Sequence, residues 1–480
     1  MSNRPETNKQ SCPVYKKCGG CQLQNLSYPE QLEFKQRKVE KLLKRFCTVE
    51  KIIGMKTPYH YRNKVQAAFY TDKKGKIISG VYQSGSHHVV GIDSCQTEDV
   101  IADKIIVAVR KLLPSFRMTT YNEDTGKGFL RHILVKRGFA TNQIMLVLVT
   151  GTPVFPSKNN FVKAILKQFP EITTIVQNIN PYRTNLVLGD NQKVLYGKGY
   201  IEDILCGCRF RISPKSFYQI NPVQTEVLYG KAIEFANLKG NETVLDTYCG
   251  IGTIGIIAAK NGAGNVIGAE LNGDAVRDAI VNARANNLKN IRFYKADAGE
   301  FMREAADEDE KPDVVFMDPP RAGSDRKFLD SLIKMSPKKV VYVSCNPETL
   351  ARDLAYLTQN SPYKAQKIQP VDMFPHTAHI ETVCLLVLRN PVTHINIDVD
   401  VEEMVQDKRG LATYEQIKDY VLEHSGLKVS SLYIAQVKQK YGIIERENYN
   451  KPKSEDARQP QCPLEKERAI TEALKHFEML

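Results

Sequence analysis

The sequence predicts an α/β protein, and three observations along the chain lead to this fold class. Between Lys239 and Asn390, short apolar runs alternate with helical runs, as in a mainly parallel, doubly wound sheet. Residues 60 to 210 instead alternate β-rich runs with turn clusters, which indicates an α+β accessory domain. Beyond residue 395 a polar stretch leads into helical runs. We therefore expect a small helical extension after the main sheet.

Length and composition limit the classes of protein to consider. A chain of 480 residues is too long for one ordinary core, so we expect two or three domains. A hydrophobic share of 42%, with no apolar run near 18 residues, predicts a soluble protein without a membrane span. The polar start, Met1 to Lys17, lacks the features of a signal peptide. We expect a cytoplasmic protein, in which the eleven cysteines are thiols or metal ligands.

Positive charge is concentrated at the front of the chain. The net charge is +13, and residues 1 to 75 hold 16 Lys and Arg against six Asp and Glu, a net of +10. This surplus predicts a surface that binds a polyanion such as RNA. Arg62 and Lys64 are candidate phosphate contacts, although a plain surface role fits each of them equally. The run Glu30 to Phe46 mixes both signs at helical spacing and could simply be a solvated helix face.

Four cysteines near the front suggest a metal centre. Cys12, Cys18 and Cys21 have the spacing C-x5-C-x2-C, and Cys95 could complete a set of four thiolates. This spacing is close to that of iron–sulfur ligation and favours a [4Fe–4S] cluster. A structural zinc ion is the alternative, since zinc also takes four thiolates. Unrelated core cysteines fit less well, because the neighbours are Lys, Gly and Gln rather than apolar residues.

The elements of the main sheet can be placed one by one. Its predicted strands are Thr243 to Asp246, Asn265 to Glu270, Ile291 to Lys295, Asp313 to Met317, Lys339 to Ser344 and Glu381 to Leu388. Predicted helices include Ile254 to Lys260, Asp274 to Asn286 and Thr349 to Leu357. In the accessory domain we expect strands at Lys64 to Tyr70, Gln143 to Val149 and Thr173 to Asn178, with a helix near Phe161 to Phe169. In the extension we expect helices at Tyr414 to Glu423 and Val429 to Lys440, after a linker from Ile395 to Gly410.

A cofactor site is predicted where the first strand of the main sheet ends. Asp246 is followed by a turn containing Gly250 and Gly252, and glycine allows the backbone to approach a ligand closely. Glu270 ends the next strand, about 20 residues on, where an acid can bind a ribose. The third glycine of the full dinucleotide fingerprint is missing, which disfavours an NAD enzyme without excluding one.

A cysteine at a strand end is the candidate nucleophile. Cys345 stands between an apolar strand and the turn Asn346-Pro347. Alternatively, a cysteine on a buried strand can be a small apolar core residue without a chemical role. Asp318, in Asp-Pro-Pro-Arg321, and Glu381 also fall at strand ends, the edge where α/β active sites form.

Taken together, these motifs resemble a known family. Ser216-Phe-Tyr-Gln-Ile-Asn221, Asp246 to Gly252, Asp318-Pro-Pro-Arg321, Ser344-Cys-Asn-Pro347 and His379-Ile-Glu-Thr-Val383 are similar, in this order, to the RNA 5-methyluridine methyltransferases of the RumA/TrmA type. The resemblance covers about residues 10 to 390. Its four-cysteine motif is shared with the branch that methylates 23S ribosomal RNA and is absent from the transfer-RNA branch.

The resemblance implies a fold, a cofactor and residue roles. It implies a Rossmann-like class I methyltransferase domain with a seven-stranded, mainly parallel sheet. S-adenosylmethionine would bind to Gln219, Tyr248, Gly250, Glu270 and Asp318. Cys345 would be the nucleophile that attacks C6 of uracil, and Glu381 the general base that removes the C5 proton. Phe217 would stack where the flipped-out base had been.

The domains and the substrate follow from the same resemblance. We expect a cluster and RNA-binding region at 1–210, whose helical segment 24–55 packs on the catalytic domain, then the catalytic domain at 211–394 and an extension at 395–480. The expected substrate is 23S rRNA, free or partly assembled, and the expected state is a monomer. The 23S branch carries an oligonucleotide-binding domain ahead of the cysteines, whereas Cys12 stands near the start here, so RNA contacts are expected elsewhere.

Other functions stay open beside this one. Transfer-RNA methylation at uridine 54 would use the same catalytic residues. An amino-group methyltransferase is disfavoured because Arg321 stands where its motif has an aromatic residue. An RNA-binding scaffold without catalysis would leave Cys345 dispensable.

Overall fold

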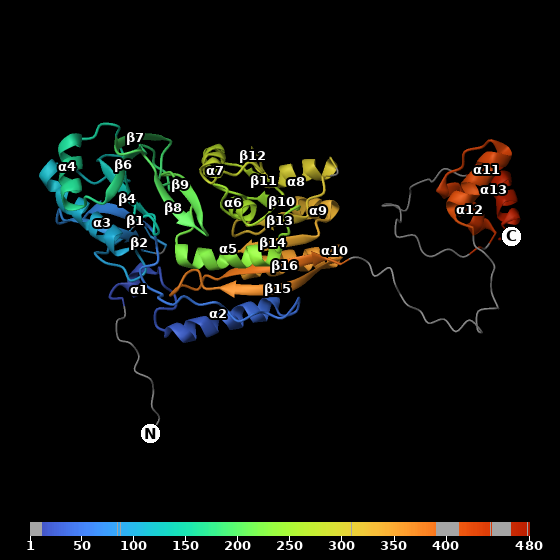
Figure 1. Ribbon diagram of the computed structural model, residues 1–480, viewed down its shortest axis with the longest axis horizontal. Helices are drawn as coiled ribbons and strands as arrows, with labels where there is room; N and C mark the ends of the chain where they lie inside the picture. The colour runs from blue at the N-terminus through green and yellow to red at the C-terminus, as the bar shows by residue number, and fades with distance from the viewer. Residues whose placement is uncertain are drawn as a thin grey trace, which may run out of the picture. The chain divides into compact units, whose positions relative to one another are not determined.

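The protein is described by a computed structural model that covers residues 12–389, 412–443 and 462–480, apart from single residues at 84, 87, 309, 442 and 478. The chain divides into two compact units, Met1–Val392 and Thr393–Leu480. The first unit contains two seven-stranded sheets, and the second is helical (Figure 1). The predicted linker from 395 to 410 lies outside the described residues.

The main sheet is built from the second half of the first unit. Its strands lie in the order β12 (Ile291–Lys295), β11 (Asn265–Glu270), β10 (Thr243–Thr247), β13 (Val314–Met317), β14 (Lys339–Ser344), β16 (Glu381–Leu388) and β15 (Tyr363–Val371). The first five strands are parallel, and β16 runs antiparallel to both of its neighbours. The central strands are almost fully buried, as expected for a parallel sheet covered on both faces.

Helices cover both faces of this sheet. One face packs against α5 (Pro222–Ala236), α6 (Thr253–Lys260) and α7 (Gly273–Ala285). The other packs against α8 (Ala298–Asp307), α9 (Arg326–Met335) and α10 (Pro347–Asn360). The alternation of strands and helices along the chain therefore produces two separate apolar cores, one on each side of the sheet.

The predicted α/β class and the mainly parallel sheet are confirmed. The six predicted strands of this sheet are present, with ends that differ by at most one residue. The edge strand β15 was not predicted. A strand is recognised from a run of apolar residues, and this one is interrupted by the polar residues Lys364, Gln366 and Lys367. These polar side chains are tolerated because β15 lies at the edge of the sheet.

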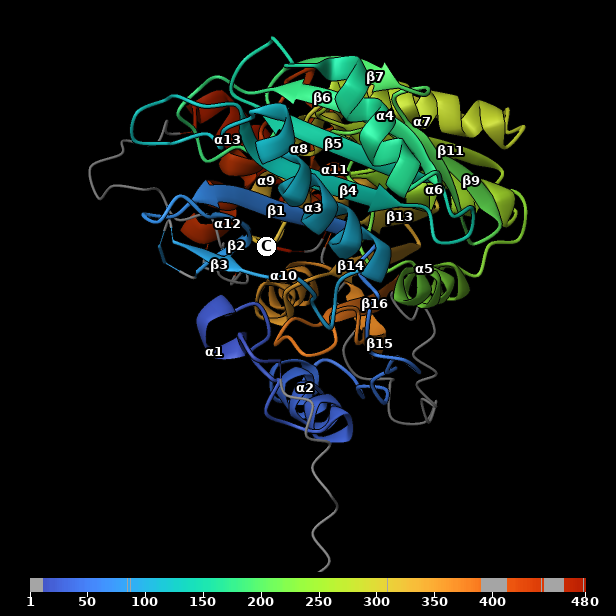
Figure 2. The same ribbon diagram turned by 90° about the vertical axis from the view of Figure 1, so that its left-hand side faces the viewer.

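The accessory sheet is mixed. Its order is β3 (Val89–Gly91), β2 (Ile77–Tyr82), β1 (Lys64–Thr71), β4 (Leu130–Arg137), β5 (Ile144–Thr150), β6 (Ile172–Ile179) and β7 (Asn191–Tyr196). Only β5 and β6 are parallel, joined by α4 (Lys158–Gln168). Helices α3 (Val100–Leu112) and α4 cover one face (Figure 2). The hairpin β8 (Ile201–Leu205) and β9 (Cys208–Ile212) lies on the other face and continues the core into the main domain.

The N-terminal segment crosses from one sheet to the other. After the short helix α1 (Tyr15–Cys18), α2 (Tyr28–Leu43) lies along β15 and α10 of the main domain, as the blue helix beneath the orange strands shows (Figure 1). Ser27 and Glu30 form a capping box at its start. The helix buries Val39 and Leu43 in the apolar core of this face.

The second unit is a small helical module. Its helices are α11 (Tyr414–Ser425), α12 (Ser431–Lys440) and α13 (Leu464–His476). Their shared core includes Ile417, Val421, Ile434 and Ile470, all nearly inaccessible to solvent. Helices at the first two positions were predicted, whereas α13 was not.

Candidate active site

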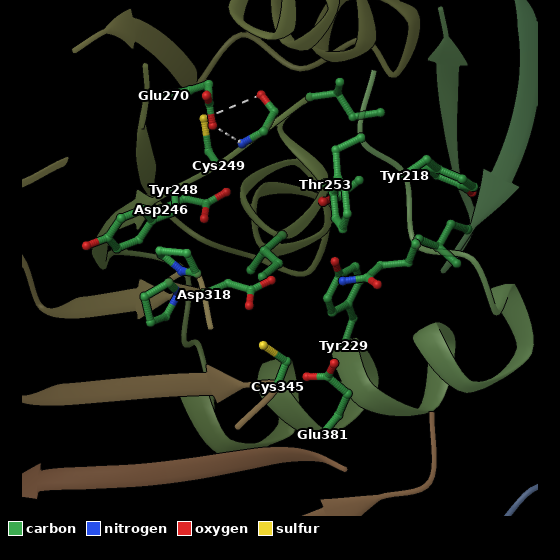
Figure 3. Close-up of a pocket in the computed structure, with 18 of the residues that line it drawn as sticks. Tyr218, Tyr229, Asp246, Tyr248, Cys249, Thr253, Glu270, Asp318, Cys345 and Glu381 are labelled. Carbon is green, nitrogen blue, oxygen red and sulfur yellow. Dashed lines mark hydrogen bonds between the residues drawn. The ribbon is translucent and has the colours of Figure 1, made fainter. Parts of the chain in front are cut away.

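Functional side chains of the main sheet meet at one edge. Glu270 is the last residue of β11, Asp318 follows β13 directly, and Cys345 follows β14 directly. Glu381 is the first residue of β16, and because this strand is antiparallel its start lies at the edge where the others end. Ser344 pairs with Thr382, so Cys345 and Glu381 occupy facing positions, side by side in Figure 3.

A cavity of about 400 Å³ opens at this edge. It lies between the strand ends, the glycine loop after β10, the start of α6, and the segment that precedes α5. Its lining includes all eight residues predicted to bind cofactor, act in catalysis or stack at the flipped base: Phe217, Gln219, Tyr248, Gly250, Glu270, Asp318, Cys345 and Glu381. The structure thus brings together one set of side chains that are widely scattered along the sequence.

The glycine loop after β10 is shaped by backbone hydrogen bonds. Gly250 has a positive φ of 55°, and its N–H donates to the Glu270 carboxylate at 3.0 Å. The Asn272 N–H donates to the same carboxylate at 2.8 Å. Gly252 also has a positive φ, and a Cβ there would approach the Phe293 ring to 2.7 Å. The loop therefore needs glycine at 252, where a side chain would clash, while the positive φ at 250 favours glycine, and two backbone N–H groups orient Glu270 at the cavity wall.

Buried carboxyl groups dominate the electrostatics of the cavity. Burial raises the pKa of Asp246 to about 7, although the Gly255 N–H that donates to it at 2.7 Å opposes the shift. Burial alone raises the pKa of Asp318 to about 7. Burial, helped by the Asp318 charge and opposed by Arg321, raises the pKa of Glu381 well above its usual range. A cavity so rich in desolvated acids suits a ligand that carries positive charge.

The Cys345 thiol is half-buried beside these acids. Burial is the main cause that raises its pKa to about 11, and the charges of Glu381 and Asp318 add to the shift. Arg321 acts in the opposite direction. Asn346 caps α10 directly after Cys345, and a helix N-terminus favours a thiolate. A cationic ligand in the cavity would counteract the raised pKa of the thiol, because positive charge favours the thiolate.

The segment before α5 reaches the cavity from the side of the accessory sheet. Lys136, a fully buried residue of β4, donates its Nζ to the carbonyl oxygens of Ser213 at 2.9 Å and Ser216 at 2.8 Å. Phe217 follows and is 61% exposed at the cavity wall, whereas its neighbour Tyr218 is buried. An exposed aromatic ring at a cavity mouth is available for stacking on a base.

Several lining residues were missed as site residues. Tyr229 on α5 and Phe374 on the loop before β16 line the cavity, although no motif marked them. Nothing in the local sequence of α5 distinguishes a tyrosine that faces a cavity from one that faces the core. Asp246, Arg321 and His379 also line the cavity, and the motifs named them without giving them a role.

The predicted phosphate contacts do not line the cavity. Arg62 and Lys64 are half-buried at the start of β1. Arg62 lies within electrostatic range of Tyr61, Glu98 and Cys21. Lys64 is paired across the sheet with Lys136. Their role in RNA binding stays a prediction.

The four predicted metal ligands lie in one region. Cys12, Cys18, Cys21 and Cys95 are half-buried, and burial raises the pKa of Cys21 to about 12, with the other three thiols adding to the shift. Across the described residues, however, no three His, Cys, Asp or Glu side chains are arranged to hold a metal ion. The structure therefore gives the predicted cluster no support, and it stays a prediction.

The described helices contain none that is both long and apolar enough to cross a membrane.

Comparison with known proteins identifies relatives over most of the chain. Residues 183–389 match the family model of tRNA (uracil-5-)-methyltransferases. An uncharacterized RNA methyltransferase of Bacillus cereus is 43% identical over 387 residues, which covers 80% of this chain and 84% of the relative. One from Listeria monocytogenes is 46% identical, covering 78% of this chain and 83% of the relative.

A solved structure extends this similarity to the fold. The tRNA (uracil-54, C5)-methyltransferase of Pyrococcus abyssi, in complex with S-adenosyl-L-homocysteine, is 31% identical and has a TM-score of 0.66. The alignment covers 79% of this chain and 88% of that one.

Proposed function

Because this chain belongs to the family of RNA uracil-5-methyltransferases, which depend on S-adenosylmethionine, we propose that it methylates C5 of a specific uridine in 23S ribosomal RNA. The observation that carries the proposal is the facing position of Cys345 and Glu381 at one edge of the cavity. A thiol and a carboxyl group are the two functional groups that a methylation at this carbon requires.

Cys345 activates the uracil ring. C5 of uracil is a poor nucleophile, and the addition of the Cys345 thiolate to C6 converts the ring into an enolate with electron density at C5. When bound, S-adenosylmethionine supplies the methyl group that this carbon takes up. Covalent addition thus divides one difficult substitution into two easier steps.

Glu381 completes the reaction. The C5–H bond breaks, its proton passes to the Glu381 carboxylate, and its electron pair forms the C5–C6 double bond as the thiolate leaves C6. Its pKa, raised well above the usual range, makes this carboxyl group a stronger base once ionised. The products are 5-methyluridine and the free Cys345 thiolate.

The remaining cavity residues would hold the cofactor and the base. Glu270 is oriented by two backbone N–H groups and can accept hydrogen bonds from a ribose. Asp318 and the buried carboxyl groups beside it suit the positive charge of the cofactor. We assign Gln219, Tyr248 and Gly250 to the same role, since they line the same cavity. Phe217 would stack where the flipped-out base had been.

The choice of ribosomal RNA rests on the four-cysteine motif of the 23S branch. A transfer RNA methylated at uridine 54 is the second candidate, favoured by the substrate in the name of the Pyrococcus abyssi relative. The test is to incubate the protein with 23S fragments and with unmodified transfer RNA, each containing 5-fluorouridine. Fluorine cannot leave C5 as a cation, so the covalent Cys345 adduct persists. We expect adducts with a 23S fragment; faster reaction of transfer RNA would establish the second candidate.

The cysteine motif has its own test. We propose that Cys12, Cys18, Cys21 and Cys95 bind a [4Fe–4S] cluster with a structural role, since methyl transfer needs no redox step. Protein purified without oxygen should be brown and contain about four iron and four sulfide per chain. A colourless preparation with one zinc ion would establish the alternative.

The setting of the reaction follows from the substrate. We propose a cytoplasmic monomer that acts on 23S rRNA while it is free or partly assembled, before ribosomal proteins bury the target uridine. The basic front of the chain, with Arg62 and Lys64, would contact phosphates. The extension from 395 to 480 receives no role in this proposal.

A further inference from the structure

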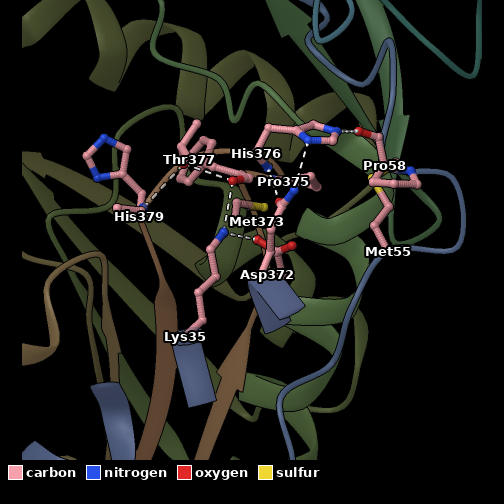
Figure 4. A network of polar contacts seen from close by, with 12 residues as sticks. Lys35, Met55, Pro58, Asp372, Met373, Pro375, His376, Thr377 and His379 are labelled. Carbon is pink, nitrogen blue, oxygen red and sulfur yellow. Dashed lines mark hydrogen bonds and ion pairs between the residues drawn. The ribbon is translucent and has the colours of Figure 1, made fainter. Parts of the chain in front are cut away.

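The loop that leads into Glu381 is held by the opposite end of the chain. Residues 372–380 connect β15 to β16 and contribute Phe374 and His379 to the cavity wall. Their hydrogen bonds run largely to residues 22–61, on and around α2 (Figure 4). Glu381 follows this loop directly, as the first residue of β16.

A buried ion pair forms the centre of this contact. Lys35 Nζ lies 2.5 Å from the Asp372 carboxylate, and both side chains are completely inaccessible to solvent. Lys35 also donates to the Phe374 carbonyl oxygen at 3.0 Å. The Tyr28 hydroxyl donates to the second Asp372 oxygen at 2.8 Å and accepts from the Met55 N–H. A buried ammonium group is tolerated only with partners such as these.

His376 is held at four polar atoms. Its N–H donates to Gln31 Oε1 at 2.8 Å, and its carbonyl accepts from the Leu23 N–H at 2.9 Å. Nε2 lies 2.9 Å from the Pro58 carbonyl, which can only accept, so Nε2 bears the hydrogen and Nδ1 accepts from Gln31 at 3.2 Å. Its positive φ of 69° is uncommon for a residue with a side chain and is kept by these surroundings.

We infer that Lys35 is a positioning residue for the general base: with Asp372, it fixes the loop 372–380 so that Glu381 faces Cys345. The inference rests on the proposed function, which makes Glu381 the base. Lys35 itself does not line the cavity, and its side chain is completely inaccessible to solvent.

The order of the chemical steps distinguishes this role from a merely structural one. Addition of Cys345 to C6 precedes proton removal from C5, so a displaced base slows only the last step. The C6–sulfur bond then breaks slowly, and a methylated Cys345–RNA adduct accumulates on ordinary uridine. General loosening of the fold would instead slow adduct formation and adduct breakdown together.

The experiment uses the full chain with the double substitution Lys35→Met and Asp372→Asn. The two substitutions together remove both charges, so that no unpaired ion is left buried. The amide oxygen introduced by Asp372→Asn can still accept a hydrogen bond from the Tyr28 hydroxyl. Lys41→Met is the matched control, since Lys41 is exposed on the same helix. Single-turnover rates are measured, because unfolded molecules lower the amplitude without changing the rate. Adducts are counted on denaturing gels.

We expect the double variant to form the 5-fluorouridine adduct at a rate within about twofold of wild type. Its turnover of ordinary substrate should fall roughly tenfold or more, with accumulation of the adduct, as expected for a misplaced base. The Lys41→Met protein should match wild type in both assays.

Two results would overturn the inference in different ways. Unchanged turnover in the double variant, or a turnover loss matched by slower adduct formation, would show that Lys35 does not position the base. A wild-type protein that forms no adduct with 5-fluorouridine RNA would instead overturn the proposed function, and the role of Lys35 with it.

Discussion

The two seven-stranded sheets of the first unit differ in how they distribute functional groups. In the main sheet, five parallel strands end at one edge, and Glu270, Asp318 and Cys345 meet there. In the accessory sheet most neighbours are antiparallel, so strand ends alternate between two edges. Its buried Arg131 is used internally, donating to the carbonyls of Asn180 and Tyr182. Strand direction, rather than the number of polar residues, concentrates chemistry in the main sheet.

The largest expected effect tests the proposed nucleophile of the main sheet, Cys345. Cys345→Ala should reduce turnover by roughly 1,000-fold or more, since it removes the thiol proposed to add to C6. RNA affinity should change little, because the binding surface stays in place. Methyl incorporation and filter binding measure the two quantities. Cys47→Ser, a change at a half-buried thiol outside the cavity, is the control and should keep full activity. A fully active Cys345→Ala protein would leave only a binding role for this edge.

The next effect separates the two steps at the same edge. Glu381→Gln should lower turnover about 100-fold, because the amide cannot take the C5 proton. The covalent adduct with ordinary uridine should accumulate, as seen by a shift on a denaturing gel. Glu234→Gln, at an exposed position on α5, should behave as wild type. If Glu381→Gln turned over normally, another group would have to remove the proton.

A smaller effect concerns the charges around the thiol. Because the pKa of Cys345 is raised to about 11, its alkylation by iodoacetamide should become about tenfold faster per pH unit between pH 7 and 10. Asp318→Asn removes a negative charge that disfavours the thiolate, so the thiol pKa should fall. Alkylation at pH 8 should then be roughly threefold faster or more. Mass spectrometry of the Cys345 peptide measures the rate.

The control for this titration is Asp330→Asn, since Asp330 is exposed on α9 and does not line the cavity. It should leave the pH profile unchanged. A profile that did not move in the Asp318→Asn protein would mean that the Asp318 charge does not contribute to the pKa of Cys345, which burial and Glu381 would then raise without it.

The smallest effect is expected in the accessory sheet. Lys64→Ala should weaken RNA binding a few-fold and reduce the magnitude of the slope of log affinity against log salt by about one. The rate of methylation within the bound RNA complex should stay the same. Lys163→Ala, exposed on α4, is the matched control. Titrations at several salt concentrations measure both. A reduced methylation rate in the Lys64→Ala protein would show that the accessory sheet contributes to catalysis and not to RNA binding alone.

The elements that the sequence could predict are those with local signals. Apolar runs marked the strands that end at Glu270 and before Cys345, and glycines marked the loop at Gly250. The polar edge strand β15 lacks such a signal, and α13 lies far along the chain from the helices with which it shares a core. The sequence also could not predict long-range ion pairs. Lys35 and Asp372 are 337 residues apart, and the sequence around each of them gives no indication of its partner.

The fully buried ion pair joins parts of the chain that the ribosome makes at very different times. Helix α2 leaves the exit tunnel first, and its counterpart follows 337 residues later, roughly 20 to 70 seconds at ordinary elongation rates. Until then Lys35 lacks its carboxylate partner, and the loop that precedes Glu381 has not been made. If Lys35 positions the proposed base as inferred, a nascent or prematurely terminated chain lacks an organised Glu381 carboxyl group until translation of the main sheet is finished.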